Sequence, residues 1–194
     1  MIDLLLSSLA LLQEEQGLLH PFIAKALASP HAIRSNFFVT AEGKIIRSSV
    51  VLKKEGLPGW VHDMADQKLG KGEDLEYEAE VYPDGSQVYE VYRRIDGREK
   101  QMSVRVDGTL FYIGTEHPVS ALPPAVSGAL AMIPGFEAKQ CVSKEGPAFH
   151  EYHVKGAREG GEFRARVGKD GRLIALQRRV PSTTEFEVVE PRSE

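Results

Sequence analysis

The stretch "DGTLFYIGTEHPVSALPP", residues 107–124, decides the fold because the chain uses its pattern twice. The upstream stretch "EGKIIRSSVVLKKEGLPG", residues 42–59, has the same order: an acid and a glycine, a run of β-branched or aromatic residues, and a Leu-Pro. An acid-glycine pair between such runs is a strong signal for a β-hairpin turn, and a proline favours the first turn of a helix. Each stretch therefore predicts a hairpin turn, a strand and a helix.

A third turn with the same neighbours lies further along the chain. Gly43, Gly108 and Gly171 each follow an acidic residue, with a valine four residues before and an isoleucine or leucine two residues after. Internal repetition of this kind is typical of chains built from repeated supersecondary units. We therefore expect three equivalent hairpin turns.

Residues 57–120 contain one complete unit of the repeat. The segment "LPGWVHDMADQKLGKG", residues 57–72, has apolar residues near helical spacing and ends in glycines, which predicts a helix. The segment "LEYEAEVY", residues 75–82, alternates apolar and mainly acidic residues, which predicts a half-buried strand. Acid-glycine turns divide the rest into antiparallel strands, four in all; they lie at Gly85, Gly97 and Gly108.

Residues 121–194 repeat this order, and residues 1–56 hold N-terminal helical segments and a single hairpin as a partial repeat. Strands joined by short turns, with one apolar face, need a layer of helices on that face. The sequence therefore predicts an α+β fold: tandem units of a helix and a four-stranded antiparallel meander, with the helices packed on one face of the sheet. We expect the three segments to form one continuous globular body.

The strand residues of the first unit also resemble a known family pattern. They are Tyr89-Glu90-Val91, Gly97, Val104, Val106-Asp107-Gly108 and Leu110, and the second unit keeps Glu151-Tyr152, Val154, Val167 and Asp170-Gly171. This pattern resembles PepSY and PepSY-like domains, and the tandem order of helix and four strands resembles proteins similar to β-lactamase inhibitor protein. The resemblance covers about Leu57 to Val180. It implies a non-catalytic binding or inhibitory module, in a group most of whose members are exported.

Composition and charge narrow the class of partner. The 194 residues are 42% hydrophobic and 27% charged, which is ordinary for a globular chain. A net charge of −4 without a basic stripe argues against nucleic acid as a partner. The single cysteine, Cys141, is expected to be an unreactive thiol on a strand.

The leucine-rich N-terminus "MIDLLLSSLALLQEEQ", residues 1–16, has Asp3 where a signal peptide is basic, and its apolar run is too short to span a bilayer. We expect no membrane partner and a cytoplasmic location. This segment is expected to form an amphipathic helix that packs either on the domain or on a second copy in a homodimer.

The sheet face away from the helices holds the candidate binding residues. A two-residue loop at Asp107-Gly108 would place Val104 opposite Phe111 on the core face and Ser103 opposite Tyr112 on the open face. The open face of the first unit is then expected to carry Tyr82, Val88, Glu90, Tyr92, Arg105 and Tyr112, beside an exposed acidic stripe of Glu76, Glu78 and Glu80. Trp60 is expected to fill the core.

Tyrosine and arginine on one face are typical of protein-contact surfaces, although tyrosines also simply favour strands. The candidate partner-binding residues are Tyr82, Glu90, Tyr92, Arg105 and Tyr112. The partner is expected to be another protein.

The chain carries no assembled catalytic motif. In "HEYH", residues 150–153, alternation along a strand points the two histidines to opposite faces, so they cannot share one metal ion. We predict no cofactor, no metal site and no enzymatic activity. The sequence favours a non-catalytic protein-binding module, such as an inhibitor, an immunity-type protein or a regulatory protein.

The alternative is a small-ligand protein or an enzyme whose site is assembled only in the fold. Its loose candidates are His62, Asp63, His117, His150 and Glu151. A deep enclosed pocket with converging polar groups would favour this alternative, and a broad sheet face would favour protein binding.

Overall fold

The computed structural model describes residues 19–40 and 42–181. The helices within these residues are α2 (Pro21–Leu27), α3 (Gly59–Leu69) and α4 (Pro124–Ala131), with short 3₁₀ turns η2 (Lys54–Gly56) and η3 (Val119–Ala121). The strands of the first part are β1 (Ala32–Val39), β2 (Ile45–Leu52), β3 (Glu73–Val81), β4 (Gln87–Ile95), β5 (Arg98–Arg105) and β6 (Leu110–His117). Those of the second part are β7 (Glu137–Gly146), β8 (Phe149–Arg158), β9 (Gly161–Gly168) and β10 (Leu173–Arg179).

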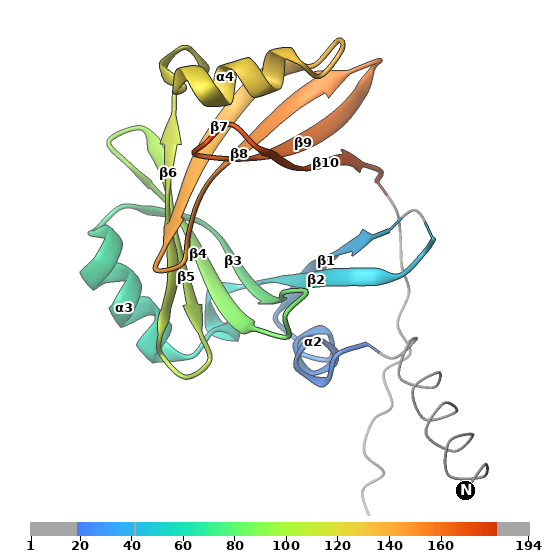
Figure 1. The fold of residues 1–194 in the computed structure, drawn as a ribbon. Coiled ribbons are helices and arrows are strands. Elements are labelled where there is room, and N and C mark those ends of the chain that lie inside the picture. Colours follow the sequence, from blue (N-terminus) through green and yellow to red (C-terminus); the bar gives the residue numbers. More distant parts are fainter. Residues whose placement is uncertain (1–18, 41, 182–194) are drawn as a thin grey trace, which may run out of the picture.

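The strands form one antiparallel sheet in which their spatial order is their order in the chain. Figure 1 shows that the sheet curls, with α2, α3 and α4 on its outer side. The complete units are α3 with β3–β6 and α4 with β7–β10, and α2 with β1–β2 forms a shorter one. The predicted α+β class and the placement of the helices on one face are confirmed.

The units share one hydrogen-bonded ladder. β6 pairs with β7 from Ile113 opposite Glu145 to His117 opposite Cys141, so the sheet continues across the junction between the complete units.

The unit boundaries predicted after residues 56 and 120 stay a prediction. The predicted N-terminal helix and its packing fall in residues 1–18, outside the described residues. None of the helices within the described residues has the length and apolarity to cross a membrane.

The acid-glycine turns are equivalent. Gly43, Gly108 and Gly171 all have a φ of +86°, a left-handed conformation that only glycine adopts at little cost. In each turn the glycine N–H donates to the carbonyl three residues earlier, and that residue's N–H donates to the carbonyl just after the glycine. The turn at Gly85 has the same two hydrogen bonds, from Gly85 N–H to the Tyr82 carbonyl and from Tyr82 N–H to the Ser86 carbonyl. The prediction of three equivalent hairpin turns is confirmed.

These turns have three-residue loops rather than two, which changes the register that the sequence suggested. Val104 pairs with Leu110, and a bulge follows, so the predicted pairing of Val104 with Phe111 is wrong. Ser103 pairs with Tyr112 as predicted. The extra residue turns Phe111 away from the helix-covered core and onto the inner face, where its ring lies 4.9 Å from that of Tyr82.

Two apolar cores lie between the sheet and the helices. The core under α2 and α3 includes Ile23, Val61, Ala65, Val91, Met102 and Val104, and the core under α4 includes Val126, Leu130, Cys141, Val154 and Val167. Burial of each large aliphatic side chain contributes about 1.5–3 kcal/mol. Burial also raises the pKa of the Cys141 thiol to about 11, which leaves it unreactive as predicted.

Trp60 is not a core residue. It is 37% exposed in the first turn of α3, with its ring edge against Tyr89 at a centroid distance of 6.1 Å. The prediction that it fills the core is wrong because the inward positions of this helix belong to Val61, Ala65 and Leu69.

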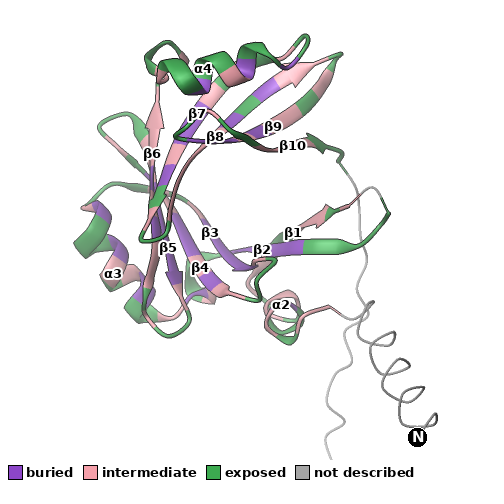
Figure 2. Ribbon diagram, in the orientation of Figure 1, coloured by how far each residue is buried: buried purple, intermediate pink, exposed green. Residues whose placement is uncertain are grey.

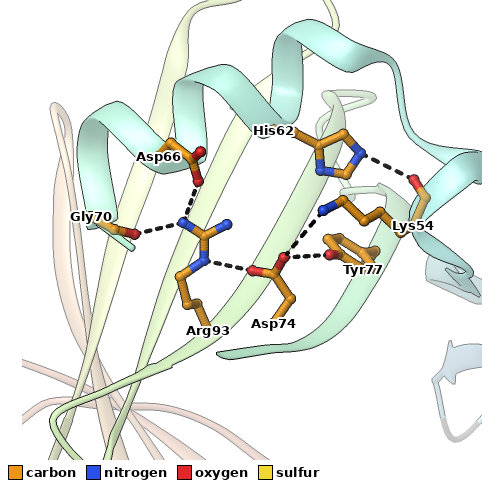
Figure 3. A network of polar contacts seen from close by, with 7 residues as sticks. All are labelled: Lys54, His62, Asp66, Gly70, Asp74, Tyr77 and Arg93. Atoms are coloured by element: carbon orange, nitrogen blue, oxygen red, sulfur yellow. Dashed lines mark hydrogen bonds and ion pairs between the residues drawn. The ribbon is translucent and has the colours of Figure 1, made fainter. Parts of the chain in front are cut away.

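A buried arginine fastens the end of α3 to the sheet (Figure 3). Arg93 on β4 donates to the Gly70 carbonyl at 2.6 Å, to Asp66 Oδ1 at 2.7 Å and to Asp74 Oδ1 at 2.5 Å. The first of these bonds satisfies a carbonyl that the helix end leaves free. Arg93 and the Tyr77 hydroxyl lower the pKa of Asp74, although partial burial acts in the opposite direction.

This network predicts a sharp difference between two adjacent arginines. Arg93→Met should lower the free energy of unfolding by about 3 kcal/mol, because it leaves Asp74 and a helix carbonyl without their buried partner. Arg94→Met should cost less than about 1 kcal/mol, because the Arg94–Glu73 pair is exposed. Urea unfolding of both variants measures the difference. Equal losses would show that the Arg93 network does not anchor α3.

Candidate functional site

The inner face of the sheet carries the candidate binding residues. Glu78, Glu90, Ser103 and Tyr112 lie directly opposite one another on β3, β4, β5 and β6, and we call them the central row. Residues that are directly opposite on antiparallel strands share a face. Tyr92 lies in the adjacent row, opposite Glu76 and Gln101, while Val88 lies opposite Glu80 and Arg105.

Most of this face is buried, which contradicts the predicted exposed acidic stripe. Glu80, Glu90 and Tyr112 are fully buried and Glu78 nearly so, whereas the Glu76 side chain is 26% exposed. Figure 2 shows buried residues running along β3, β4 and β5. The stripe prediction is wrong because it treated the sheet as flat, and the curl removes the inner face from water.

The buried charges of the inner face are compensated by side chains from strands on either side. Arg47 on β2 donates to Glu80. Lys144 on β7 donates to the Tyr112 hydroxyl and lies 4.2 Å from the centre of the Tyr112 ring. A residue of the second complete unit therefore reaches into the central row of the first.

Glu90 is the ionised carboxylate at the centre of this network. It accepts hydrogen bonds from the hydroxyls of Tyr82 at 3.0 Å and Tyr92 at 2.7 Å. Burial acts to raise its pKa, but the positive charges of Lys144 and Arg47, together with the tyrosine hydrogen bonds, outweigh burial and lower the pKa to about 2.

Its neighbour Glu78 has a raised pKa, which favours the protonated form. The Tyr92 hydroxyl has one proton, which it donates at short range to Glu90, and its distance to Glu78 Oε2 is 3.3 Å. Glu78 can share that contact as a donor if it carries a proton of its own. Burial and the charges of Glu80 and Glu90 raise the pKa of Glu78 well above its ordinary value. Burial likewise raises the pKa of Glu80 to about 7 in spite of Arg47.

The three carboxylates are close enough to act as a ligand set. Oxygens of Glu78, Glu80 and Glu90 lie within 4.8 Å of one another, and carboxylate oxygens suit Ca²⁺ or Mg²⁺. However, Arg47 and Lys144 already compensate charge at this position, and the raised pKa of Glu78 favours a bound proton. The arrangement is therefore better suited to internal charge pairing than to a divalent metal ion.

Half-buried aromatic rings extend along the end of the inner face where the acid-glycine turns lie. We call Phe38, Tyr82, Phe111 and Phe149 the aromatic row. The Arg47 guanidinium lies 4.5 Å from the ring centre of Phe38 and 4.8 Å from that of Tyr82. Ring centroids are 4.9 Å apart between Tyr82 and Phe111 and 5.7 Å apart between Phe111 and Phe149.

Arg105 covers the Phe111 ring at 4.6 Å, which adds a second cation to the aromatic row. Sequence reasoning found Tyr82 and Arg105, and it considered Phe149 only as part of an alternative surface on the second unit, but it missed Phe38 and Phe111 as members of this surface. The signal was present, because each aromatic residue stands within a few positions of a hairpin turn.

The loose catalytic candidates do not converge. His62 Nε2 lies 3.1 Å from the Lys54 carbonyl, and Asp63 lies beside it on α3. His117 Nε2 lies 2.8 Å from Ser143 Oγ. The His150 ring stacks on Tyr152, and Glu151 forms an ion pair with Arg166 at 2.9 Å. His62 and Asp63 belong to the outer helix layer, and Glu151 belongs to the inner face of the other unit. The face divergence predicted for "HEYH" is observed, since His153 contacts Glu151 rather than His150.

Comparisons with known proteins find likeness in fold only. No family model matches the chain, and no curated protein matches it. A DUF2874 family protein from Bacteroides uniformis has 12% identity and a TM-score of 0.50 over 63% of this chain and 89% of its own. A BLIP-like protein from Bacteroides fragilis has 17% identity and a TM-score of 0.40 over 93% of this chain and 99% of its own. The PepSY part of the sequence resemblance stays a prediction.

One comparison corrects the expected location. A structure from Bacteroides eggerthii, described among "putative periplasmic proteins", has 12% identity and a TM-score of 0.50 over 62% of this chain and 88% of its own. This finding points away from the cytoplasm and contradicts the prediction of a cytoplasmic chain. That prediction rested on the charge of the first residues, which is a weak guide to export.

Protonation of Glu78 can be tested through the pH dependence of stability. A carboxyl whose pKa is raised by folding favours the folded state below its unfolded pKa of about 4.3, and this contribution is lost as the pH rises through the folded pKa. Glu78→Gln cannot ionise, so this variant should gain stability relative to the wild type between about pH 5 and about pH 8.

Urea unfolding at both pH values measures this gain. The control is Glu145→Gln, at an exposed position on β7, whose difference from the wild type should stay nearly constant. A constant difference for Glu78→Gln as well would contradict a protonated Glu78.

Proposed function

We propose that this chain is a non-catalytic protein-binding module that contacts its partner through the aromatic row and Arg105, while the buried Arg47 holds two of the rings in place from beneath. The observation that carries the proposal is the continuity of half-buried rings and stacked guanidinium groups across several strands. Aromatic residues and arginine dominate the binding energy of protein interfaces, since they offer large rigid contact areas. The cation stacking orders these side chains before a partner arrives, which lowers the entropy cost of binding.

The five candidate partner-binding residues predicted from the sequence do not all have the same role in this proposal. Tyr82 and Arg105 belong to the accessible surface, and Tyr82 with Phe111 and Phe149 supplies its anchors. Glu90 and Tyr112 are fully buried, so they support the surface from beneath rather than touch the partner. Tyr92 lies on the side of the central row opposite to Arg105, so it is not one of the anchors.

A small-ligand or catalytic role has less support. A hollow on the inner face has a volume of about 40 Å³, and a more open one beside His117 and Lys139 has about 280 Å³. Sites for drug-sized ligands usually have volumes of about 300–1,000 Å³. An inhibitor, an immunity-type protein and a regulatory protein would each act by covering a partner's surface, and the aromatic row would serve any of them.

The proposal is tested by site-specific cross-linking in the native cells. A photo-reactive phenylalanine analogue in place of Phe111 should cross-link one defined protein. The same analogue in place of Met132, which is exposed on the outer side, should not cross-link that protein.

Affinity then tests the anchors in the purified pair. The Tyr82→Ala/Phe111→Ala double variant should bind the cross-linked protein at least about 30-fold more weakly, because two anchors of the interface are removed. Circular dichroism checks that the variant is folded. Unchanged affinity in a folded double variant would refute the aromatic row as the contact surface.

A further inference from the structure

Two positive side chains on the inner face of the second unit oppose each other. Lys155 on β8 and Arg164 on β9 are directly opposite across the strand pair. Like charges in this position destabilise a sheet. The nearest acid on the same face of β8, Glu151, is already paired with Arg166 at 2.9 Å. Neither Lys155 nor Arg164 forms an ion pair within residues 19–40 and 42–181.

Both side chains line a small cavity together with polar residues and the apolar side chain of Val142. The remaining polar walls include Lys144, His153 and Gln101. His153 Nδ1 and Gln101 Oε1 are buried and have no hydrogen-bond partner. Both atoms are hydrogen-bond acceptors, because Gln101 Nε2 donates to Glu99 and His153 Nε2 faces Glu151, so they require a donor such as water and do not themselves favour an anion.

The electrostatic character of the cavity is positive. Burial, followed by the charges of Lys144, Arg166, Arg164 and Arg47, holds the pKa of His153 well below its ordinary value. Burial also lowers the pKa of Lys144 to about 8, with Arg164 and Arg47 acting in the same direction and Glu90 and Glu80 opposing it. Lys155 is exposed and Arg164 is half-buried, and because these two like charges lie directly opposite each other they favour a nearby anion.

The volume of the cavity limits the size of the anion that it can hold. A water molecule needs about 10–15 Å³ of such volume, so a cavity of about 40 Å³ has room for two or three small polar atoms. Gly114 allows the lining residues Gln101 and Val142 to pack closely against β6, because a Cβ there would lie 2.9 Å from Gln101 Cβ and 3.2 Å from Val142 Cγ1. The space suits a planar carboxylate group, while the rest of any molecule that carries it must lie outside.

We propose that this cavity receives the carboxylate of an aspartate or glutamate side chain of the partner protein. The inference rests on the proposed function, because the carrier of the carboxylate must lie along the inner face that the partner would cover. A guanidinium can bond both carboxylate oxygens, so Arg164 fixes the orientation of the group. Lys155 at the exposed side adds charge, and the carboxylate relieves the repulsion between the two cations.

The test uses two matched probes and needs no partner protein. N-acetyl-glutamate amide is titrated into the isotopically labelled full chain at constant ionic strength, and N-acetyl-glutamine amide serves as its neutral isostere. The glutamate derivative should cause saturable shifts of the His153 and Gln101 resonances, and it should bind at least about tenfold more tightly than the glutamine derivative, since charge-assisted bonds are lost in the latter.

Variants identify the residues that hold the carboxylate. Arg164→Gln and Lys155→Gln should each weaken binding of the glutamate derivative severalfold, and the exposed turn variant Lys169→Gln, which removes the same charge, should not. Lys155→Gln should leave the unfolding midpoint unchanged or higher because it removes a like-charge contact, so its loss of binding cannot come from misfolding.

The outcomes separate this inference from the proposed function. Equal binding of the two derivatives, absence of saturable shifts, or binding that survives both Arg164→Gln and Lys155→Gln would overturn the carboxylate site. Inorganic phosphate binding more tightly than the glutamate derivative would also overturn it. These results leave the cross-link at Phe111 unaffected, whereas a failed cross-link overturns the proposed function without changing the titration.

Discussion

The curl of the sheet removes charged side chains of the inner face from water, so their charges must be compensated by other side chains inside the molecule. The compensating side chains come from different repeated units, and this links the units to one another. Glu78 and Glu90 lie directly opposite each other, an arrangement that would be repulsive if both were ionised. The charge of Lys144 from β7 stabilises ionised Glu90, the raised pKa of Glu78 favours a bound proton there, and Arg47 pairs with Glu80. Without these partners, burial of several carboxylates would favour a flatter sheet, because each ionised group would regain water.

This electrostatic centre determines what the rest of the inner face can do. Tyr82 donates its hydroxyl to Glu90, so one ring of the aromatic row is fixed by the buried network beneath it. Arg47 has two tasks, since it pairs with Glu80 and stacks on the rings of Phe38 and Tyr82. The face therefore combines a rigid aromatic surface at its turn end with uncompensated positive charge on β8 and β9, where a partner of complementary shape and negative charge would gain most.

Local signals in the sequence were sufficient for the elements and for the side of the sheet on which most strand residues lie, with Phe111 as an exception. Gly43, Gly108 and Gly171 specify their turns because the left-handed conformation admits little else, and alternation along β3 separates core residues from glutamates. The bulge at Phe111 was missed because the same acid-glycine pair can close a two-residue or a three-residue loop. Which loop forms depends on which backbone hydrogen bond closes it, and that bond sets the register. Burial of Glu80 was missed because curl depends on strands far apart in sequence. For the same reason, no local pattern could bring Lys144 to Tyr112 or Lys155 to the cavity.

A double-mutant cycle between Lys144 and Glu90 tests most directly whether charge compensation across the units holds the inner face together. Lys144→Met should lower the free energy of unfolding by about 3–5 kcal/mol, because Glu90 keeps its charge in a buried place. Lys139→Met, at an exposed position on the same strand, should change it by less than about 0.5 kcal/mol. Combined with Glu90→Gln, the loss from Lys144→Met should shrink by at least about 1.5 kcal/mol, whereas additivity within about 0.5 kcal/mol would contradict the account.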